Sequence, residues 1–532
     1  MSGAWVWPSV RFCATVRAEM TESATASEPA ESGLGREVKV VAAVVIVGMF
    51  MAVLDTTIVN VALETLARDL NSPLSTIQWV SSGYLLSLAV VIPLAGWATE
   101  RFGSKRVWMV SIAIFGVSSA LCGLAWSDSS LIFFRVLQGL GGGMIMPVGI
   151  SLLAQSAGPQ RMGRVMSVVG VPILLGPILG PVIGGAIVSG ASWRWIFYVN
   201  VPIAVIALVL AARLLGADTG RADSGRLDWR GFLLLAPGLV GIVFGLSETE
   251  TQGGITHPVA FGPIVAGLAL VSAFAIYSYR SPRPLIDVRL FGSRSFSAAS
   301  ATTFFVAAAL FASFLVLPLY YQVARGASPL DTGLLMAPQG VGAALALPIA
   351  GRLVDRIGAG PVVVFGTVVM TLGTLPFAFV GAHTSDPLLL SALVVRGIGL
   401  GSAMQPAIAG ALEVLSSAQV PRATGALNVI QRTGGALGAA LLAVVLEHQL
   451  ALASSGSPSG AGALQSAAGV AGGDPGLATA FANTFWWAIG LSVLAIVPAA
   501  ILAITNHRER NQAPAEPRRP AGTPRVAAKA PG

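Results

Sequence analysis

The chain has 532 residues, of which 54% are hydrophobic and only 11% are charged, and its formal net charge is +8. Soluble domains carry about 25% charged residues, so these figures exclude a water-soluble fold. They also exclude a disordered chain, which would be polar and highly charged. The composition indicates an all-α polytopic membrane protein.

The excess of positive charge does not indicate nucleic-acid binding, because the 32 Lys and Arg residues are scattered rather than clustered. The two cysteines, Cys13 and Cys122, and the four isolated histidines show no ligand spacing. We therefore expect no metal site, no cofactor and no nucleic-acid partner.

Fourteen apolar runs are long enough to cross the hydrocarbon layer as helices, which takes about 20 residues. Continuous apolar runs, rather than alternating ones, predict helices instead of a membrane barrel. The runs cover residues 39–63, 76–97, 107–126, 130–156, 163–189, 196–216, 229–248, 259–279, 297–322, 332–353, 361–380, 387–412, 422–446 and 481–504.

The positions of Lys and Arg predict the orientation of these spans. With a cytoplasmic N-terminus, 26 of the 32 basic residues fall in cytoplasmic segments, three lie in outer loops (Arg68, Arg194 and Arg325) and three lie within spans (Arg135, Arg396 and Arg432). Basic residues collect on the cytoplasmic side of membrane proteins. The sequence therefore predicts a multi-pass protein of the cell (cytoplasmic) membrane with both termini in the cytoplasm.

Two loops with the same residue spacing follow the second and the tenth predicted spans, which indicates an internal repeat. Each has a Gly, an acid four residues later, an Arg next and a second Gly two residues after that. The acid and the Arg can join the two halves by ion pairs when the cavity faces outward. Alternatively, these basic residues only set the topology. The residues are Gly96, Glu100, Arg101, Gly103, Lys105 and Arg106 in the first loop, and Gly351, Asp355, Arg356 and Gly358 in the second.

The repeat divides the chain into two six-helix halves, residues 39–216 and 297–506. Residues 217–296 form a linker with two inserted transmembrane helices. Residues 1–38 and 507–532 are polar and are predicted to be disordered cytoplasmic tails, with Met20 as a possible true start.

These loops resemble the signature loop of the major facilitator superfamily. Residues 54–63, LDTTIVNVAL, resemble the first-helix motif of its fourteen-helix drug:proton antiporter branch, and residues 193–202, WRWIFYVNVP, are also typical of that branch. Two departures are Glu100 in place of the usual Asp, and Glu64 where the family often has Pro. The resemblance covers about residues 39–505 and implies the major facilitator fold, with two six-helix halves plus two inserted helices.

Asp55 and Arg135 are the candidate proton-coupling residues. Asp55 is the carboxylate that lies well inside a predicted span, and ionised groups in a bilayer are costly, so it should face a cavity and exchange protons. Alternatively, Asp55 is a packing residue bonded to Thr56 or to a neighbouring span. Arg135 cannot neutralise itself; the resemblance ties it to proton coupling, and a structural ion pair is the alternative. Arg396 and Arg432 are weaker candidates for substrate or proton linkage.

A segment of span five resembles the antiporter motif of the family. Its glycines and prolines predict a bent helix with a smooth face, against which the other half can pack. The resemblance implies that it seals the cavity against leak, and ordinary glycine packing is the alternative. The motif residues are Gly176, Pro177, Gly180, Pro181, Gly184 and Gly185.

Aromatic, Met and Gln side chains in the spans predict a mainly apolar cavity with few charges, which suits lipophilic compounds. The candidate substrate-binding residues are Gln138, Met144, Phe311, Tyr320 and Gln405.

The resemblance and these residues predict a proton-coupled antiporter, a monomer surrounded by membrane lipids, that exports lipophilic small molecules (drugs, dyes, antibiotics or lipids) by alternating access. An importer of a nutrient and a transport-inactive membrane scaffold are the alternatives. A membrane enzyme is disfavoured because the loops hold scattered single acids without a metal-ligand set, and ATP-driven export because no Gly-rich phosphate loop is present.

Overall fold

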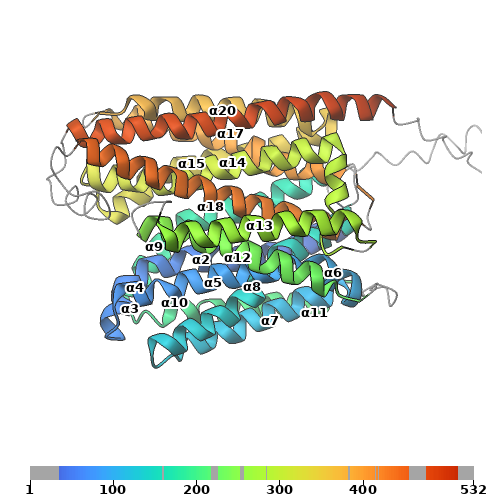
Figure 1. The fold of residues 1–532 in the computed structure, drawn as a ribbon, viewed down its shortest axis with the longest axis horizontal. Coiled ribbons are helices and arrows are strands. Elements are labelled where there is room, and N and C mark those ends of the chain that lie inside the picture. Colours follow the sequence, from blue (N-terminus) through green and yellow to red (C-terminus); the bar gives the residue numbers. More distant parts are fainter. Residues whose placement is uncertain are drawn as a thin grey trace, which may run out of the picture.

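The computed structural model describes residues 35–157, 161–216, 226–251, 257–282, 284–381, 384–413, 415–416, 419–453 and 475–512. Within these ranges the chain forms helices and no strands, and the long helices lie side by side in one bundle (Figure 1). The rest of the predicted tails and most of the loop between the last two spans lie outside the described residues.

The N-terminal half consists of the helices from α2 to α11. Its second predicted span is not one straight helix, because α5 and α6 are bent by 56° at a short break that contains Pro93. Proline lacks a backbone N–H and interrupts the helical ladder. The elements of this half are α2 (Arg36–Ile58), η1 (Val59–Ala62), α3 (Leu63–Asp69), α4 (Leu74–Ile77), α5 (Trp79–Val91), α6 (Leu94–Phe102), α7 (Ser104–Gly123), α8 (Asp128–Ala157), α9 (Met162–Gly190), α10 (Trp195–Tyr198) and α11 (Asn200–Leu214).

The C-terminal half consists of the helices from α14 to α20. Serine side chains cap two of its helices, because Ser293 accepts a hydrogen bond from the Phe296 N–H and Ser328 accepts one from the Asp331 N–H. The elements are α14 (Arg294–Leu319), η4 (Tyr320–Ala324), α15 (Pro329–Ile357), α16 (Ala359–Thr374), η5 (Leu375–Phe379), α17 (Asp386–Glu413), α18 (Val420–Ala453) and α20 (Pro475–Gln512).

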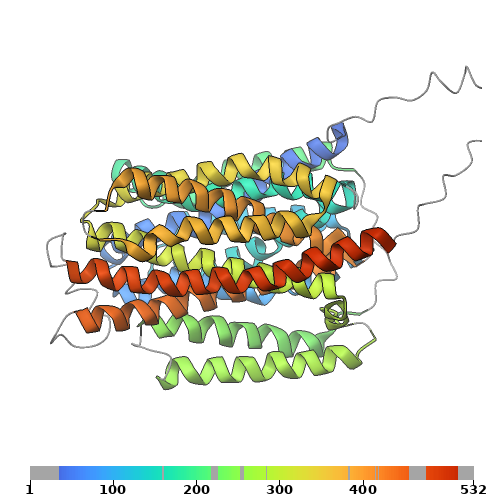
Figure 2. The same ribbon diagram turned by 90° about the horizontal axis from the view of Figure 1, so that it is seen from above.

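Between the halves, α12 (Trp229–Thr251) and α13 (Pro258–Arg280) lie along one side of the bundle, followed by the short η3 (Val288–Gly292) (Figure 2). Apolar residues of α12 pack on both halves: Leu239 shares a buried cluster with Ala89 of α5 and Ala426 of α18. The ring of Phe244 also stacks on Trp79 at 5.9 Å. The inserted pair therefore covers the seam between α5 and α18.

All fourteen predicted spans coincide with helices. Twelve helices of the described chain are long and apolar enough to cross a membrane, and the bent α5–α6 pair raises that number to thirteen. The 29-residue α9 occupies the place of the fifth predicted span, 163–189. Fourteen membrane crossings stay a prediction. Helices α2 and α20 also extend a few residues into the segments predicted as tails, to Arg36 and Gln512.

The two halves pack together at one end of the bundle, where α6 meets α7 and where α20 ends; we call it the α6 end (Figure 1). One apolar cluster there contains residues of both halves, such as Met162 of α9 and Val354 of α15. At the opposite end, where α3 and α4 lie, each half has a separate cluster, around Trp193 in one and Phe481 in the other. The halves are therefore joined at the α6 end.

Candidate functional site

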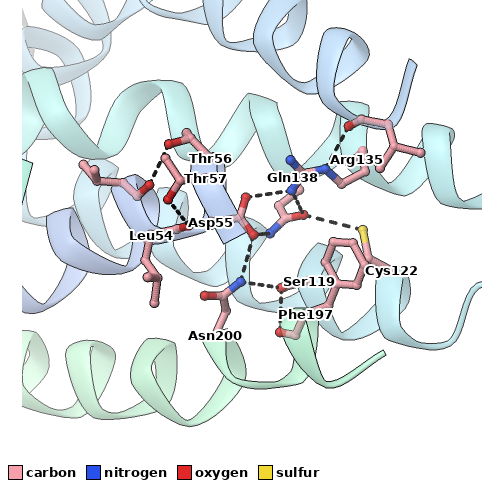
Figure 3. Close-up of polar contacts among 12 residues, drawn as sticks. Leu54, Asp55, Thr56, Thr57, Ser119, Cys122, Arg135, Gln138, Phe197 and Asn200 are labelled. Carbon is pink, nitrogen blue, oxygen red and sulfur yellow. Dashed lines mark hydrogen bonds and ion pairs between the residues drawn. The ribbon is translucent and has the colours of Figure 1, made fainter. Parts of the chain in front are cut away.

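Asp55 and Arg135 form an ion pair that is fully enclosed in the N-terminal half (Figure 3). Arg135 Nη1 lies 2.6 Å from Asp55 Oδ2, and the two side chains are 1% and 0% exposed. The second carboxylate oxygen, Oδ1, accepts hydrogen bonds from Gln138 Nε2 at 3.0 Å and from Asn200 Nδ2 at 2.9 Å. The carboxylate therefore has a partner on each oxygen and no contact with solvent.

The guanidinium of Arg135 is held on several sides as well. Its Nε donates to the Val80 carbonyl at 3.0 Å, and Nη1 also donates to Gln138 Oε1 at 2.9 Å. The Tyr84 ring lies against its flat face, with 4.1 Å from the guanidinium carbon to the ring centroid. Such a planar, multi-donor cation holds a buried carboxylate in a defined geometry that a lysine could not reproduce.

Glycines of α8 bring these partners close to Arg135. A Cβ at Gly139 would lie 2.6 Å from the Tyr84 carbonyl oxygen, and one at Gly142 would lie 2.8 Å from the Tyr84 hydroxyl. On the other side, a Cβ at Gly141 would lie 2.7 Å from the backbone of Phe115 in α7. The glycine run after Arg135 thus allows α5 and α7 to approach α8.

The segment of residues 193–202 contributes Asn200 to the site. The Trp193 side chain is 1% exposed and anchors the start of α10 in the apolar cluster at the opposite end from α6. Asn200 then points into the bundle, where its amide nitrogen donates to Asp55 and, at 3.1 Å, to Ser119 Oγ. Sequence reasoning noted the motif but missed this role, because Asn200 lies 145 residues from Asp55.

Of the two alternative partners expected for Asp55, Thr56 was wrong, whereas bonding to neighbouring spans is observed. Thr56 Oγ1 donates to the Val53 carbonyl at 2.6 Å, within its own helix, and not to Asp55. Asp55 instead joins α2 to α8 and α11. Chemically, the pair is a buried carboxylate and a permanent cation, of which only the carboxylate can change charge by taking up a proton.

The repeated loops place one ion pair each between the halves at the α6 end. Glu100, in the last turns of α6, lies 2.8 Å from Arg422 of α18, and Asp355, near the end of α15, lies 2.9 Å from Arg164 of α9. Asp355 also accepts a hydrogen bond from the Gly163 N–H at 3.1 Å. The predicted acids do face the other half, but their partners come from the starts of helices rather than from the loops.

The two loops share one backbone conformation. Gly103 has φ 89° and ψ 147°, and Gly358 has φ 94° and ψ 163°, a region open essentially only to glycine. Each of these residues ends one helix and begins the next. Gly96 and Gly351 allow close contact, since a Cβ at Gly351 would lie 2.6 Å from the Gly163 carbonyl oxygen and one at Gly96 would lie 3.0 Å from Arg422 Cα.

The basic residues of the loops do not all reach the other half. Lys105 Nζ donates to the Leu215 carbonyl at 2.7 Å, so it caps the end of α11 within the N-terminal half. Arg101, Arg106 and Arg356 are exposed at the α6 end.

The glycines of the predicted antiporter motif do not face the other half, which corrects the expected packing. Gly176 lies against Val53 and Gly180 against Thr57, both on α2, and a Cβ at Gly184 would lie 2.9 Å from Ile58. A Cβ at Gly185 would meet no described atom within 4 Å. The residues spaced by four thus form a groove for the helix that carries Asp55, because such residues share one face of α9. Pro177 and Pro181 lie on the same helix.

The candidate substrate-binding residues occupy different surroundings. Gln138 is 0% exposed and both ends of its amide are engaged by Asp55 and Arg135, so it belongs to the ion-pair site. Tyr320 is 0% exposed in the apolar cluster of the C-terminal half, and Met144 packs against the shared cluster. Phe311 is 44% exposed beside Gly435, and Gln405 is 3% exposed against Gly170 of α9.

In the C-terminal half, Arg396 lies inside α17 as Arg135 lies inside α8, but it has no carboxylate partner in the described chain. It donates to Gln339 Oε1, to Thr374 Oγ1 at 3.2 Å and to the Ala309 carbonyl at 3.4 Å. Among the described residues, a fully enclosed ion pair is therefore a feature of the N-terminal half alone, since the Arg325–Asp386 pair of the C-terminal half is partly exposed.

Comparisons with known proteins agree with this architecture. The family model of the Major Facilitator Superfamily matches residues 45–439 and 299–530. The "Multidrug resistance protein B homolog" of Mycobacterium tuberculosis (strain H37Rv) is 43% identical over 411 residues, which are 77% of this chain and 76% of that protein. The "Putative multidrug resistance protein MdtD" of Serratia proteamaculans is 34% identical over 337 residues, 63% of this chain and 70% of that protein.

Solved structures show the same fold at low identity. The human organic anion transporter MFSD10 superposes with a TM-score of 0.58 at 16% identity, over 87% of this chain and 100% of that chain. The proton:xylose symporter XylE gives a TM-score of 0.57 at 15% identity, over 87% and 95% of the two chains.

Family model, relatives and solved structures all agree with the all-helical membrane architecture. The protein is accordingly a multi-pass membrane transporter of small molecules rather than an enzyme, and the chain belongs to the Major Facilitator Superfamily.

Proposed function

We propose that this protein is a proton-coupled antiporter that exports lipophilic small molecules across the cell membrane. Two of its relatives, 43% and 34% identical, carry the name of multidrug resistance proteins. The observation that carries the proton coupling is the enclosed ion pair of Asp55 and Arg135, 2.6 Å apart.

Protonation of Asp55 removes the negative charge that balances Arg135. Removing one charge of a buried ion pair costs about 3–5 kcal/mol, because the other charge stays buried without a partner. A conformational equilibrium with a gap of a few kcal/mol is shifted by an effect of this size. Proton uptake at Asp55 is thus strong enough to change which state of the transporter is populated.

Helix α9 connects this site to the contact between the halves. Its glycines Gly176 and Gly180 pack on α2 next to Asp55, and the first turn of the same helix carries Arg164, which pairs with Asp355 of α15. A shift of α2 after protonation moves α9 because the two helices are in direct backbone contact. We infer that α9 transmits the protonation state of Asp55 to the α6 end.

The pairs of Glu100 with Arg422 and of Asp355 with Arg164 act as the gate at that end. They hold the halves together in the present state and separate when the cavity opens there, as alternating access between two rigid halves requires. The excess of Lys and Arg at the α6 end orients it toward the cytoplasm. Both termini are then cytoplasmic, and the present state is closed to the cytoplasm.

The proton gradient supplies the driving force. A proton that moves down a potential of about 100 mV releases about 2.3 kcal/mol before any pH difference is added. Two protons supply about 4.6 kcal/mol, on the order of a thousandfold gradient of substrate. The transporter acts as a monomer, since each chain contains one ion-pair site and both gate pairs.

The test is Asp55→Asn in proteoliposomes of the full chain, with 8-anilino-1-naphthalenesulfonate and N-phenyl-1-naphthylamine as lipophilic dyes. We expect that an imposed pH gradient drives dye out of the cytoplasmic-side compartment in the wild type and that Asp55→Asn abolishes this flux. Asp69→Asn, an acid at the end of α3, is the matched control and should retain it. Unchanged gradient-driven flux in folded Asp55→Asn would exclude Asp55 from the coupling.

A further inference from the structure

The two halves differ in the charges that they place inside the membrane. In the N-terminal half, Asp55 balances Arg135. In the C-terminal half, the described carboxylates of the helices lie toward helix ends, at Asp331, Asp355, Asp386, Glu413 and Glu447, whereas the guanidinium groups of Arg396 and Arg432 lie well inside α17 and α18. The interior of the C-terminal half therefore carries positive charge that no described carboxylate balances.

Of these two cations, Arg396 is satisfied by neutral groups. Gln339, Thr374 and the Ala309 carbonyl surround its guanidinium, and the side chain is 2% exposed. It is closed off within its own half, so it contributes positive potential but offers no site for direct contact.

Arg432 lies on the face of α18 that is turned toward the N-terminal half. Successive residues on this face contact the N-terminal half. Arg422 pairs with Glu100, and a Cβ added at Gly425 would lie 3.8 Å from the Ile92 carbonyl oxygen. Val429 packs beside α5 and α6. Ten residues after Arg422, Arg432 is about 15 Å further along the helix, in the neighbourhood of Tyr84 of α5.

Arg432 has no hydrogen bond and no ion pair with any described residue, and it is partly exposed. This separates it from Arg135 and Arg396, whose guanidinium groups are each held by several acceptors. A permanent cation inside a membrane span must face water, carbonyls or an anion. Arg432 therefore keeps unused donor capacity on the face of α18 that is turned toward the N-terminal half.

A second unsatisfied group lies at the same level of the bundle. Gln431, next to Arg432 in the sequence, donates to the sulfur of Met404 at 3.8 Å, so this part of α18 contacts the part of α17 that holds Gln405. The side chain of Gln405 is 3% exposed, and its Oε1 accepts no hydrogen bond from the residues that the structure describes. Gln405 also packs against Gly170 of α9, on the opposite half. Two polar side chains with unused hydrogen-bonding capacity thus lie on the adjacent helices α17 and α18, in parts that contact each other through Gln431 and Met404.

From this arrangement we propose that Arg432 binds the acidic group of the substrate and that the transporter prefers lipophilic anions, such as aromatic sulfonates and carboxylates, over neutral or cationic compounds. Gln405 supplies a further polar contact, since its amide can donate as well as accept. The proposal rests on the proposed export function and specifies its substrate class. An anion that leaves a negative interior also moves with the membrane potential.

The experiment uses probes that differ in charge. 8-Anilino-1-naphthalenesulfonate is a lipophilic anion, N-phenyl-1-naphthylamine has the same rings without the sulfonate, and tetraphenylphosphonium is a lipophilic cation. Binding to the purified full chain is measured by fluorescence or equilibrium dialysis, and flux is measured separately in proteoliposomes under a proton gradient. The variants are Arg432→Gln, the charge-retaining Arg432→Lys, and the surface control Arg289→Gln, in which an exposed Arg changes in the same way.

We expect the wild type to bind the sulfonate at least tenfold more tightly than the other two probes. Arg432→Gln should raise the dissociation constant and the KM for the sulfonate at least tenfold and change those for the neutral dye less than twofold. Arg432→Lys should retain most of the preference, and Arg289→Gln all of it. Circular dichroism and gel filtration establish that each variant is folded.

Two results would overturn the anion preference: equal or tighter binding of tetraphenylphosphonium by the wild type, or the same effect of Arg432→Gln on the neutral dye as on the sulfonate. Charge-selective binding without any gradient-driven flux would instead refute the export function and leave the anion site standing. Proton-driven flux that depends neither on probe charge nor on Arg432→Gln would refute the anion site and leave the export function standing.

Discussion

Arg422 of α18 lies 2.8 Å from Glu100 of α6, and the relationship is reciprocal between the halves, because Arg164 of α9 lies 2.9 Å from Asp355 of α15. Each Arg is the third residue of its helix. Each acid stands three residues before a glycine with positive φ, Gly103 or Gly358. The internal repeat thus closes the α6 end with two equivalent ion pairs, one from each half's loop.

The first prediction concerns this pair of ion pairs. Partly exposed ion pairs contribute about 0.2–1 kcal/mol each, so loss of both in Glu100→Gln/Asp355→Asn should shift the equilibrium toward an open α6 end by up to roughly 30-fold. Ser167→Cys in a variant lacking Cys13 and Cys122 reports this opening, because Ser167 packs against Gly351 of the other half: a Cβ added at Gly351 would lie 2.7 Å from Ser167 Oγ. The labelling rate by a thiol reagent should rise.

The matched control is Asp331→Asn, the same chemical change in the first turn of α15 at the opposite end of the bundle. Its labelling rate should equal that of the parent. If the double variant is labelled no faster than the control, the ion pairs do not hold the halves together.

The second prediction concerns the geometry of Arg135. Arg135→Lys keeps the charge but loses the fork that reaches Val80, Gln138 and Asp55 together. Each hydrogen bond of a charged group contributes about 1.5–3 kcal/mol, so loss of two of them should reduce proton-driven flux by at least about 100-fold. Arg194→Lys, at a guanidinium that lies over Trp193, is the control and should transport normally. Normal flux in Arg135→Lys would contradict the coupling role.

A third prediction separates the glycines of α9. Gly180→Ala places a methyl group against Thr57 of α2 and should destabilise the protein by about 1–3 kcal/mol and impair flux. Gly185→Ala meets no described atom within 4 Å, so it should be neutral or slightly stabilising through the better helix propensity of alanine. Thermal unfolding in detergent, together with dye flux, measures both variants. Equal behaviour of the two would show that α2 and α9 are not closely packed.

The fourth prediction concerns the anchor of the inserted helices. Asp228 accepts hydrogen bonds from the Gly231 N–H at 2.9 Å, the Tyr277 hydroxyl at 2.8 Å and the Leu285 N–H at 3.1 Å. Asp228→Ala leaves three donors without this acceptor, and we expect a loss of about 2–4 kcal/mol and faster proteolysis of the segment after α13. Asp287→Ala, which removes an acceptor for the Arg289 N–H, serves as the comparison and should have a smaller effect. Equal proteolysis rates would refute the anchoring role.

The candidate site was only partly predictable from the sequence. Asp55 and Arg135 are recognisable because an ionised residue in an apolar run needs a special environment. Their pairing is not recognisable, because 80 residues separate them and the pattern around each is compatible with other neighbours. For the same reason Gln138 was predicted to bind substrate, although folding directs its amide to Asp55.

The glycine pattern of α9 likewise predicts a helix face but not its neighbour. The spacing of Gly176, Gly180 and Gly184 predicts a smooth helix face, but it does not say which helix lies against that face. The expected neighbour was the other half, and the observed neighbour is α2.

The sequence by itself determined the membrane class, the positions of the helices and the repeat. Run length, the distribution of basic residues and loop spacing are local properties, and the thickness and charge asymmetry of the membrane act on the first two directly. The tertiary structure alone decided that Asp55 is enclosed by Arg135, Gln138 and Asn200, and that Arg432 is turned toward the other half without a hydrogen-bond or ion-pair partner among the described residues. These outcomes depend on which helix faces pack together, and packing is set by the shapes of many side chains at once.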